Sequence, residues 1–84
     1  MEYEVYLRRE VFEFLRRCRR DEREPLLTLL GALGRDPYRQ GDFTERDRSG
    51  RDIEVLVFQR FAILYWADHA VKEVKVTEVR YADR

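Results

Sequence analysis

Cysteine, histidine, tryptophan and lysine are scarce in this 84-residue sequence. The scarcity of cysteine and histidine excludes several kinds of disulfide, metal and catalytic site. The single cysteine, Cys18, excludes an intramolecular disulfide framework and a zinc site built on several cysteines. No apolar run approaches the roughly 18 residues that a membrane-spanning helix needs, and the charged N-terminal segment is unlike a signal peptide. We therefore expect a cytoplasmic protein with no membrane contact and with Cys18 in its core.

The sequence also lacks a glycine-rich phosphate loop, a cluster of metal-ligating residues and a Ser-His-Asp arrangement. The single histidine, His69, falls in a predicted turn, where we expect it to be exposed. No metal and no cofactor is therefore expected, and a conventional hydrolase is disfavoured. The formal net charge is zero, which argues against a simple nucleic-acid-binding protein because such proteins are usually basic.

The basic residues that are present are almost all arginine. Of 17 lysine and arginine residues, only Lys72 and Lys75 are lysine, which leaves 15 arginines. Arginine suits planar recognition of phosphate and carboxylate groups. Seven arginines between Arg8 and Arg23 stand against four acidic residues, a local excess of three positive charges. This excess fits either a solvated helix face of ion pairs or a surface that recognises phosphate.

The segment from Asp52 to Tyr81 is the centre of the predicted fold. Three runs rich in β-branched and aromatic residues, at 52–58, 61–68 and 71–81, are separated by Gln59-Arg60 and His69-Ala70. This pattern predicts a β-meander with two tight hairpins. Both faces of the first two strands are apolar, so both need a cover. We expect helices on one face and a ligand, a protein partner or a second copy of the chain on the other.

The first 48 residues predict a strand, two helices and a further strand. Residues 2–7 alternate as a strand, and apolar residues at 11, 12, 15 and 18 follow one helical face. A second helix is expected to begin near Asp21, with Asp21 and Glu24 as a capping box and Pro25 in its first turn. Gly34 is expected to cap its C-terminus. Residues 43–48 predict a polar strand near a sheet edge.

Together these segments predict a single domain over residues 1–84. The expected class is α+β, with the order β-α-α-β-β-β-β. A helical hairpin is expected to pack on one face of an open, mostly antiparallel sheet.

This order, together with several short sequence pieces, resembles the RelE/ParE toxin superfamily of type II toxin–antitoxin systems. The pieces cover nearly the whole chain: Asp36-Pro37 after the helices, FTERD at 43–47, FAILY at 61–65 and VRY at 79–81. The resemblance implies a RelE/ParE-like toxin domain. It also implies a cognate antitoxin protein as partner and allows a heterotetramer with it.

The resemblance leaves more than one activity open. RelE-like members cleave messenger RNA in the ribosomal A site, whereas ParE-like members inhibit DNA gyrase without catalysis. The nuclease branch usually carries an arginine where this sequence has Ala62, and Arg60 is the nearest replacement. Some relatives end in R-Y-H-Y, of which Arg80-Tyr81 matches the first half. We favour a metal-independent mRNA endonuclease, with a gyrase inhibitor or a nontoxic binding module as the alternatives.

Cleaving RNA through its 2′-hydroxyl needs a base, cationic donors for the phosphate and an acid for the leaving 5′-oxygen. Glu45 and Glu54 are candidate bases, and Tyr65 and Tyr81 are candidate acids or stacking surfaces. The candidate catalytic residues are Arg60, Arg80, Tyr81 and Arg84. The candidate RNA-binding residues are Arg46, Arg48, Arg51 and Tyr65. Core packing and cross-strand surface pairs are the structural alternatives for these side chains.

Overall fold

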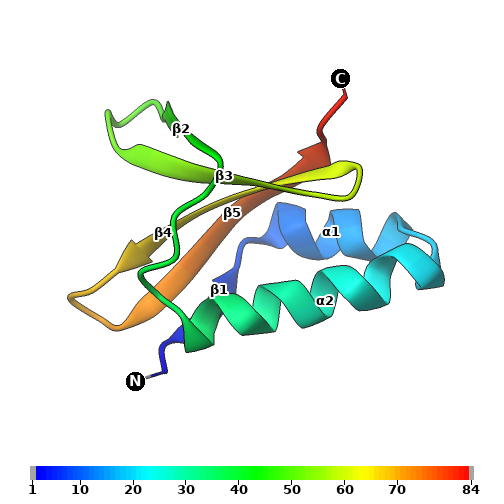
Figure 1. Cartoon of the computed structure of the whole chain (residues 1–84), viewed down its shortest axis with the longest axis horizontal. Helices are drawn as coiled ribbons and strands as arrows, with labels where there is room; N and C mark the ends of the chain where they lie inside the picture. The colour runs from blue at the N-terminus through cyan, green and yellow to red at the C-terminus, as the bar shows by residue number, and fades with distance from the viewer. Residues whose placement is uncertain (1, 84) are drawn as a thin grey trace.

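The computed structural model describes residues 2–83 as a five-stranded sheet with two helices on one face (Figure 1). The elements are β1 (Glu4–Leu7), α1 (Arg9–Arg17), α2 (Arg20–Arg35), β2 (Phe43–Arg46), β3 (Asp52–Phe58), β4 (Phe61–Asp68) and β5 (Glu73–Tyr81). The strand order is β1-β5-β4-β3-β2; the β1–β5 pair is parallel and the other pairs are antiparallel. The α+β class and the element order expected from the sequence are confirmed.

The two faces of the sheet have separate apolar clusters. Phe61, Ile63 and Tyr65 of β4 lie in the core that the helices cover. Ile53, Val55, Ala62 and Leu64 form a second cluster on the opposite face, next to Trp66. The alternation of faces predicted from the sequence is therefore correct.

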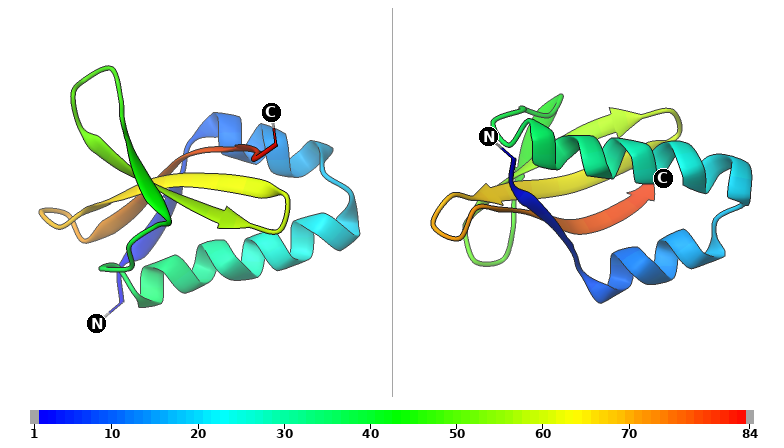
Figure 2. Two further views of the ribbon diagram at one scale, coloured as in Figure 1. Left: turned by 45° about the horizontal axis from the view of Figure 1, so that its top comes forward. Right: turned by 90° about the horizontal axis from the view of Figure 1, so that it is seen from below.

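The second cluster does not by itself require the ligand or partner that the sequence predicted on this face, because its four residues are already buried within the chain. The four clustered residues are at most 6% exposed. The segment before β2 runs beside β3, where the Asp42 N–H donates to the Val55 carbonyl at 2.8 Å. The β2–β3 hairpin also curls away from the helices and forms a wall along this face (Figures 1 and 2). We call the side of the sheet opposite the helices the open face.

Three strands are shorter than predicted. The first strand, expected over residues 2–7, is observed as β1 at Glu4–Leu7. β5 begins at Glu73 instead of Val71, because residues 69–72 form the turn and Lys72 has a φ of 57°, which no strand residue adopts. β2 ends at Arg46 instead of Arg48, because the chain turns at Asp47. The predicted two-residue hairpin at Gln59-Arg60 is confirmed, since Phe58 pairs with Phe61.

The start of α2 differs from the predicted capping box. The helix begins at Arg20, and no side chain caps it. Glu24 pairs with Arg20 at 3.1 Å instead of reaching back along the chain. Pro25 consequently lies in the second turn, where its ring nitrogen has no hydrogen to donate to the Asp21 carbonyl.

Gly34 lies inside α2 and is buried against β1, so it is not the predicted C-terminal cap. Its carbonyl accepts the Tyr3 N–H at 2.8 Å. A Cβ atom at this position would come within 2.5 Å of the Tyr3 carbonyl oxygen. The close approach of helix and strand is therefore the reason for glycine here.

We expect Gly34→Ala to lower the free energy of unfolding by about 1–3 kcal/mol, because the methyl group must push β1 from α2. Gly31→Ala in the same helix is the matched control, since a Cβ there meets nothing within 4 Å. The control should raise stability by about 1 kcal/mol through better helix propensity. Urea denaturation measures both, and equal effects of the two variants would contradict this explanation of Gly34.

Two further expectations concern the single cysteine and the membrane. Cys18 is buried, as predicted, and burial raises the pKa of its thiol. Among residues 2–83, no helix combines the length and the apolar character needed to cross a membrane.

Candidate functional site

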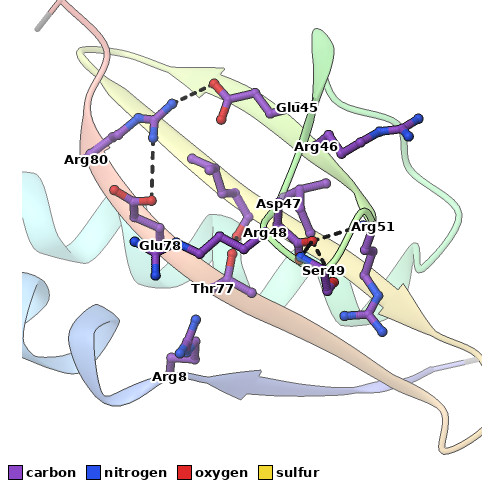
Figure 3. A pocket seen from close by; sticks show the side chains of 12 residues that line it. Arg8, Glu45, Arg46, Asp47, Arg48, Ser49, Arg51, Thr77, Glu78 and Arg80 are labelled. Carbon is purple, nitrogen blue, oxygen red and sulfur yellow. Dashed lines mark hydrogen bonds and ion pairs between the residues drawn. The ribbon is translucent and has the colours of Figure 1, made fainter.

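The open face carries a pocket of about 600 Å³ beneath the β2–β3 hairpin (Figure 3). We call it the arginine pocket, because five arginines face three acidic residues around it, a local excess of two positive charges. Ile53 and Leu64 supply apolar side chains to its lining. The full lining is Arg8, Glu45, Arg46, Asp47, Arg48, Ser49, Arg51, Ile53, Leu64, Thr77, Glu78 and Arg80.

Asp47 organises the turn that holds two of these arginines. Its Oδ1 accepts the N–H groups of Ser49 and Arg51, both at 2.9 Å, and the Ser49 hydroxyl at 2.7 Å. These hydrogen bonds, first of all that from the Ser49 side chain, lower the pKa of the Asp47 carboxyl. Asp47 therefore positions Arg48 and Arg51, and its carboxylate is engaged within the turn.

Arg80 reaches across the sheet from β5 to β2. Its Nη2 lies 2.7 Å from Glu45 Oε2, and its Nη1 lies 3.5 Å from Glu78 Oε1 (Figure 3). Strands β4 and β3 lie between β5 and β2 in the sheet. The residue of β4 directly opposite Arg80 is Ala62, whose small side chain leaves room for the guanidinium. The Glu45–Arg80 pair thus bridges the pocket above the second apolar cluster.

Arg60 and Tyr81, two of the sequence-predicted catalytic residues, lie on the other side of the sheet. Arg60 Nη1 is 3.2 Å from Glu22 Oε2 of α2, and its guanidinium lies 5.0 Å from the centre of the Tyr81 ring. The Tyr81 ring packs at 5.4 Å from Phe14 of α1. Successive strand residues face opposite sides, so Tyr81 points to the helices while Arg80 points to the open face. The expected grouping of Arg60, Arg80 and Tyr81 in one site is therefore wrong.

Tyr65 is a buried core residue and is not accessible to RNA. It is 3% exposed, and its hydroxyl donates to the Arg39 carbonyl at 3.0 Å. Burial raises its pKa to about 12, which disfavours proton donation near neutral pH. Burial likewise prevents the ring from stacking on a base, so both roles expected for Tyr65 are corrected.

The other predicted arginines of the described residues all line the arginine pocket: Arg46, Arg48, Arg51 and Arg80. Arg46 pairs with Asp52 at 3.4 Å and points away from Arg80 (Figure 3). Arg84 lies outside the described residues. Among residues 2–83, no group of His, Cys, Asp and Glu side chains is arranged to hold a metal ion.

Sequence reasoning missed Arg8. It follows β1, and β1 joins the sheet through its parallel pairing with β5. The Arg8 N–H donates to the Val76 carbonyl at 3.1 Å, which brings the side chain to the rim of the pocket. Only the parallel pairing shows this, because Arg8 and Arg80 are far apart in the sequence. The excess of arginine between Arg8 and Arg23 was the one signal that pointed to it.

The mixed five-stranded sheet with two helices on one face has the fold of the RelE toxins. No protein-family model matches the sequence, and no curated protein matches it. The resemblance inferred from sequence pieces is supported instead by comparison with solved structures, at the level of the fold.

Solved structures of this class superpose on nearly the whole chain. The archaeal RelE–RelB complex from Pyrococcus horikoshii OT3 has a TM-score of 0.79 at 15% identity, over 100% of this chain and 99% of that one. The RelBE2 toxin–antitoxin complex from Mycobacterium tuberculosis has a TM-score of 0.77 at 17% identity, over 96% and 99%. The isolated RelE toxin of E. coli has a TM-score of 0.75 at 18% identity, over 98% and 86%.

Proposed function

We propose that this chain is the toxin of a type II toxin–antitoxin pair and inhibits translation by cleaving messenger RNA on the ribosome, without a metal or cofactor. The observation that carries the proposal is the Glu45–Arg80 pair, held at 2.7 Å in the arginine pocket of a chain with the RelE fold. A carboxylate beside a guanidinium supplies the base and the phosphate donor that the reaction needs.

The proposed reaction begins when an RNA phosphate enters the arginine pocket. Arg80 exchanges its contact with Glu45 for the phosphate, and Arg48 and Arg8 add positive charge around it. Glu45, released from Arg80, takes the proton of the 2′-hydroxyl. The 2′-oxygen forms a bond to phosphorus while the bond to the 5′-oxygen breaks, and the guanidinium groups stabilise the added negative charge. Arg80, directly opposite Ala62, supplies the charge that an arginine at that position supplies in the nuclease branch.

The leaving 5′-oxygen needs a proton, and the pocket does not provide an obvious donor. Within residues 2–83, no tyrosine, histidine or lysine lines the arginine pocket, and guanidinium groups hold their protons too tightly to act as efficient acids near neutral pH. In this proposal the proton comes from water, from the ribosome or from the carboxyl group that Glu45 forms in the first step.

The proposed antitoxin partner has apolar surface available on the helices. Phe12 of α1 is 59% exposed and Leu27 of α2 is 46% exposed, and the two side chains line one shallow groove with Leu15. An amphipathic helix of the antitoxin would cover these residues. The similar structures from Mycobacterium tuberculosis and Pyrococcus horikoshii are a toxin–antitoxin complex and a RelE–RelB complex, which supports a protein partner for this chain.

A gyrase inhibitor is the second candidate, and two observations favour it. Ala62 stands where the nuclease branch carries arginine, and Arg80 is neutralised by two carboxylates in the unbound protein. A gyrase inhibitor needs neither a base nor a phosphate donor.

Expression of the chain alone is expected to stop protein synthesis within minutes, with transcripts cut inside codons and DNA synthesis continuing. Pulse labelling of protein and DNA synthesis measures the order of these events. Co-expression of the adjacent gene should restore growth if it encodes the antitoxin. An early halt in DNA synthesis with a DNA-damage response would instead identify a gyrase inhibitor, and the absence of any growth defect would identify a nontoxic binding module.

A further inference from the structure

A second concave region, of about 310 Å³, adjoins the arginine pocket. Arg51 lines both regions, so the two regions meet at this side chain. The second region contains the rings of Tyr38, Trp66 and His69. We call it the aromatic pocket.

Tyr38 is exposed and yet held in place. Tyr38 is 73% exposed. Its ring stacks on the ring of His69, with the two ring centroids 4.8 Å apart and an angle of 17° between the ring planes. His69 Nδ1 in turn lies 2.8 Å from the hydroxyl of Tyr3, which is buried at 7% exposure. His69 covers one side of the Tyr38 ring, and the other side is presented to solvent. An aromatic ring fixed in this way loses little conformational freedom when a second planar group stacks on it.

The charged groups around these rings suit a nucleotide. The Arg51 guanidinium lies 3.8 Å over the Trp66 ring, which holds it in place beside the arginine pocket. Glu54 Oε1 accepts the Gly41 N–H at 2.7 Å, so this carboxylate is also fixed. A guanidinium pairs with a phosphate, and carboxylate oxygens accept hydrogen bonds from the amino group of a base. An apolar peptide side chain would satisfy neither group, so the chemistry favours a nucleotide over a peptide.

We propose that the aromatic pocket binds one purine base of the RNA strand, stacked on Tyr38, while a neighbouring phosphate occupies the arginine pocket. The inference rests on the proposed function for its ligand and deepens it by assigning a second RNA contact. A purine is favoured because its two fused rings cover more of the Tyr38 ring than a pyrimidine does. Glu54 lines the same pocket and would accept a hydrogen bond from an amino group of the base. Stacking of bases on aromatic side chains is a general source of affinity for single-stranded RNA.

Trp66 is the single tryptophan of the sequence and lines the aromatic pocket, so its fluorescence reports binding there. The purified protein is titrated with a single-stranded RNA tetranucleotide of adenines and with the same strand carrying one abasic position. Tyr38→Ala is expected to weaken binding of the intact strand by about 5- to 100-fold, and Tyr38→Phe, which keeps the ring, by no more than about 2-fold. Phe43→Ala is the matched control, because Phe43 is an exposed aromatic residue that lines neither pocket.

The outcomes separate this inference from the proposed function. If Tyr38→Ala and the unaltered protein bind the intact strand equally well, while Arg80→Ala binds it more weakly, the aromatic pocket is not a base site and the proposed function stands. Equal binding of the abasic and intact strands by the unaltered protein also overturns the inference. If the unaltered protein binds neither strand, in solution or with ribosomes present, both proposals fail.

Discussion

Replacing Glu45 by glutamine is expected to slow RNA cleavage by about 100- to 10,000-fold, because the amide cannot take the proton of the 2′-hydroxyl. The same change should tighten RNA binding by about 2- to 5-fold. In the unbound protein Arg80 Nη2 donates a hydrogen bond to Glu45 Oε2 at 2.7 Å. A neutral amide at position 45 would compete less well than the carboxylate with the RNA phosphate for the Arg80 guanidinium. The expected change in RNA affinity is small because an exposed ion pair has only a small interaction free energy.

Two measurements on the purified Glu45→Gln protein test this prediction: the rate at which it cleaves ribosome-bound mRNA, which should fall, and its affinity for RNA, which should rise. Glu73→Gln is the matched control, since Glu73 also lies on the sheet and pairs with a cation, Lys75 at 3.9 Å, but does not line the arginine pocket. The control removes the same charge and should leave the cleavage rate close to that of the unaltered protein. If Glu45→Gln cleaves at the normal rate, Glu45 is not the base.

Replacing Arg80 by alanine is expected to lower the cleavage rate by about 100- to 1,000-fold, the usual effect of removing one donor that stabilises charge in the transition state. RNA binding should weaken as well, because Arg80 also pairs with the phosphate before the reaction. Arg80→Lys should recover only part of the rate, since an ammonium group cannot make two parallel hydrogen bonds to a phosphate. The side chains of Arg80 and Glu45 are 41% and 40% exposed, so the melting temperature should change little.

Arg60→Ala is the informative comparison for Arg80→Ala. Arg60 is equally plausible from the sequence but pairs with Glu22 on the helix side of the sheet. We expect it to retain at least about a third of the cleavage rate, as an exposed surface substitution does. If Arg60→Ala loses as much activity as Arg80→Ala while Arg80→Lys behaves normally, the active surface lies near Tyr81 and not in the arginine pocket.

The sequence alone predicted the order of the elements and the two faces of the central strands. Alternation along β3 and β4 assigned Phe61 and Ile63 to one face and Ala62 and Leu64 to the other, and the structure agrees. These features could be predicted because the period of a strand is a local property of the chain. The same alternation places Arg80 and Tyr81 on opposite sides, but the sequence also permitted a twist at the end of the strand, and only the structure excludes their joint site. Short sequence pieces added the resemblance to the RelE/ParE superfamily, and superposition on RelE structures supports it at the level of the fold.

The tertiary structure decided which side chains meet. Arg80 contacts Glu45 across two intervening strands because the β2–β3 hairpin curls over the open face. Arg8 lines the same pocket because β1 pairs in parallel with β5. Curvature and non-local pairing of strands leave no periodic pattern in the sequence, so neither placement could be predicted from it. For the same reason, the sequence predicted Gly34 as a helix cap and did not show that the backbone of Tyr3 lies against it.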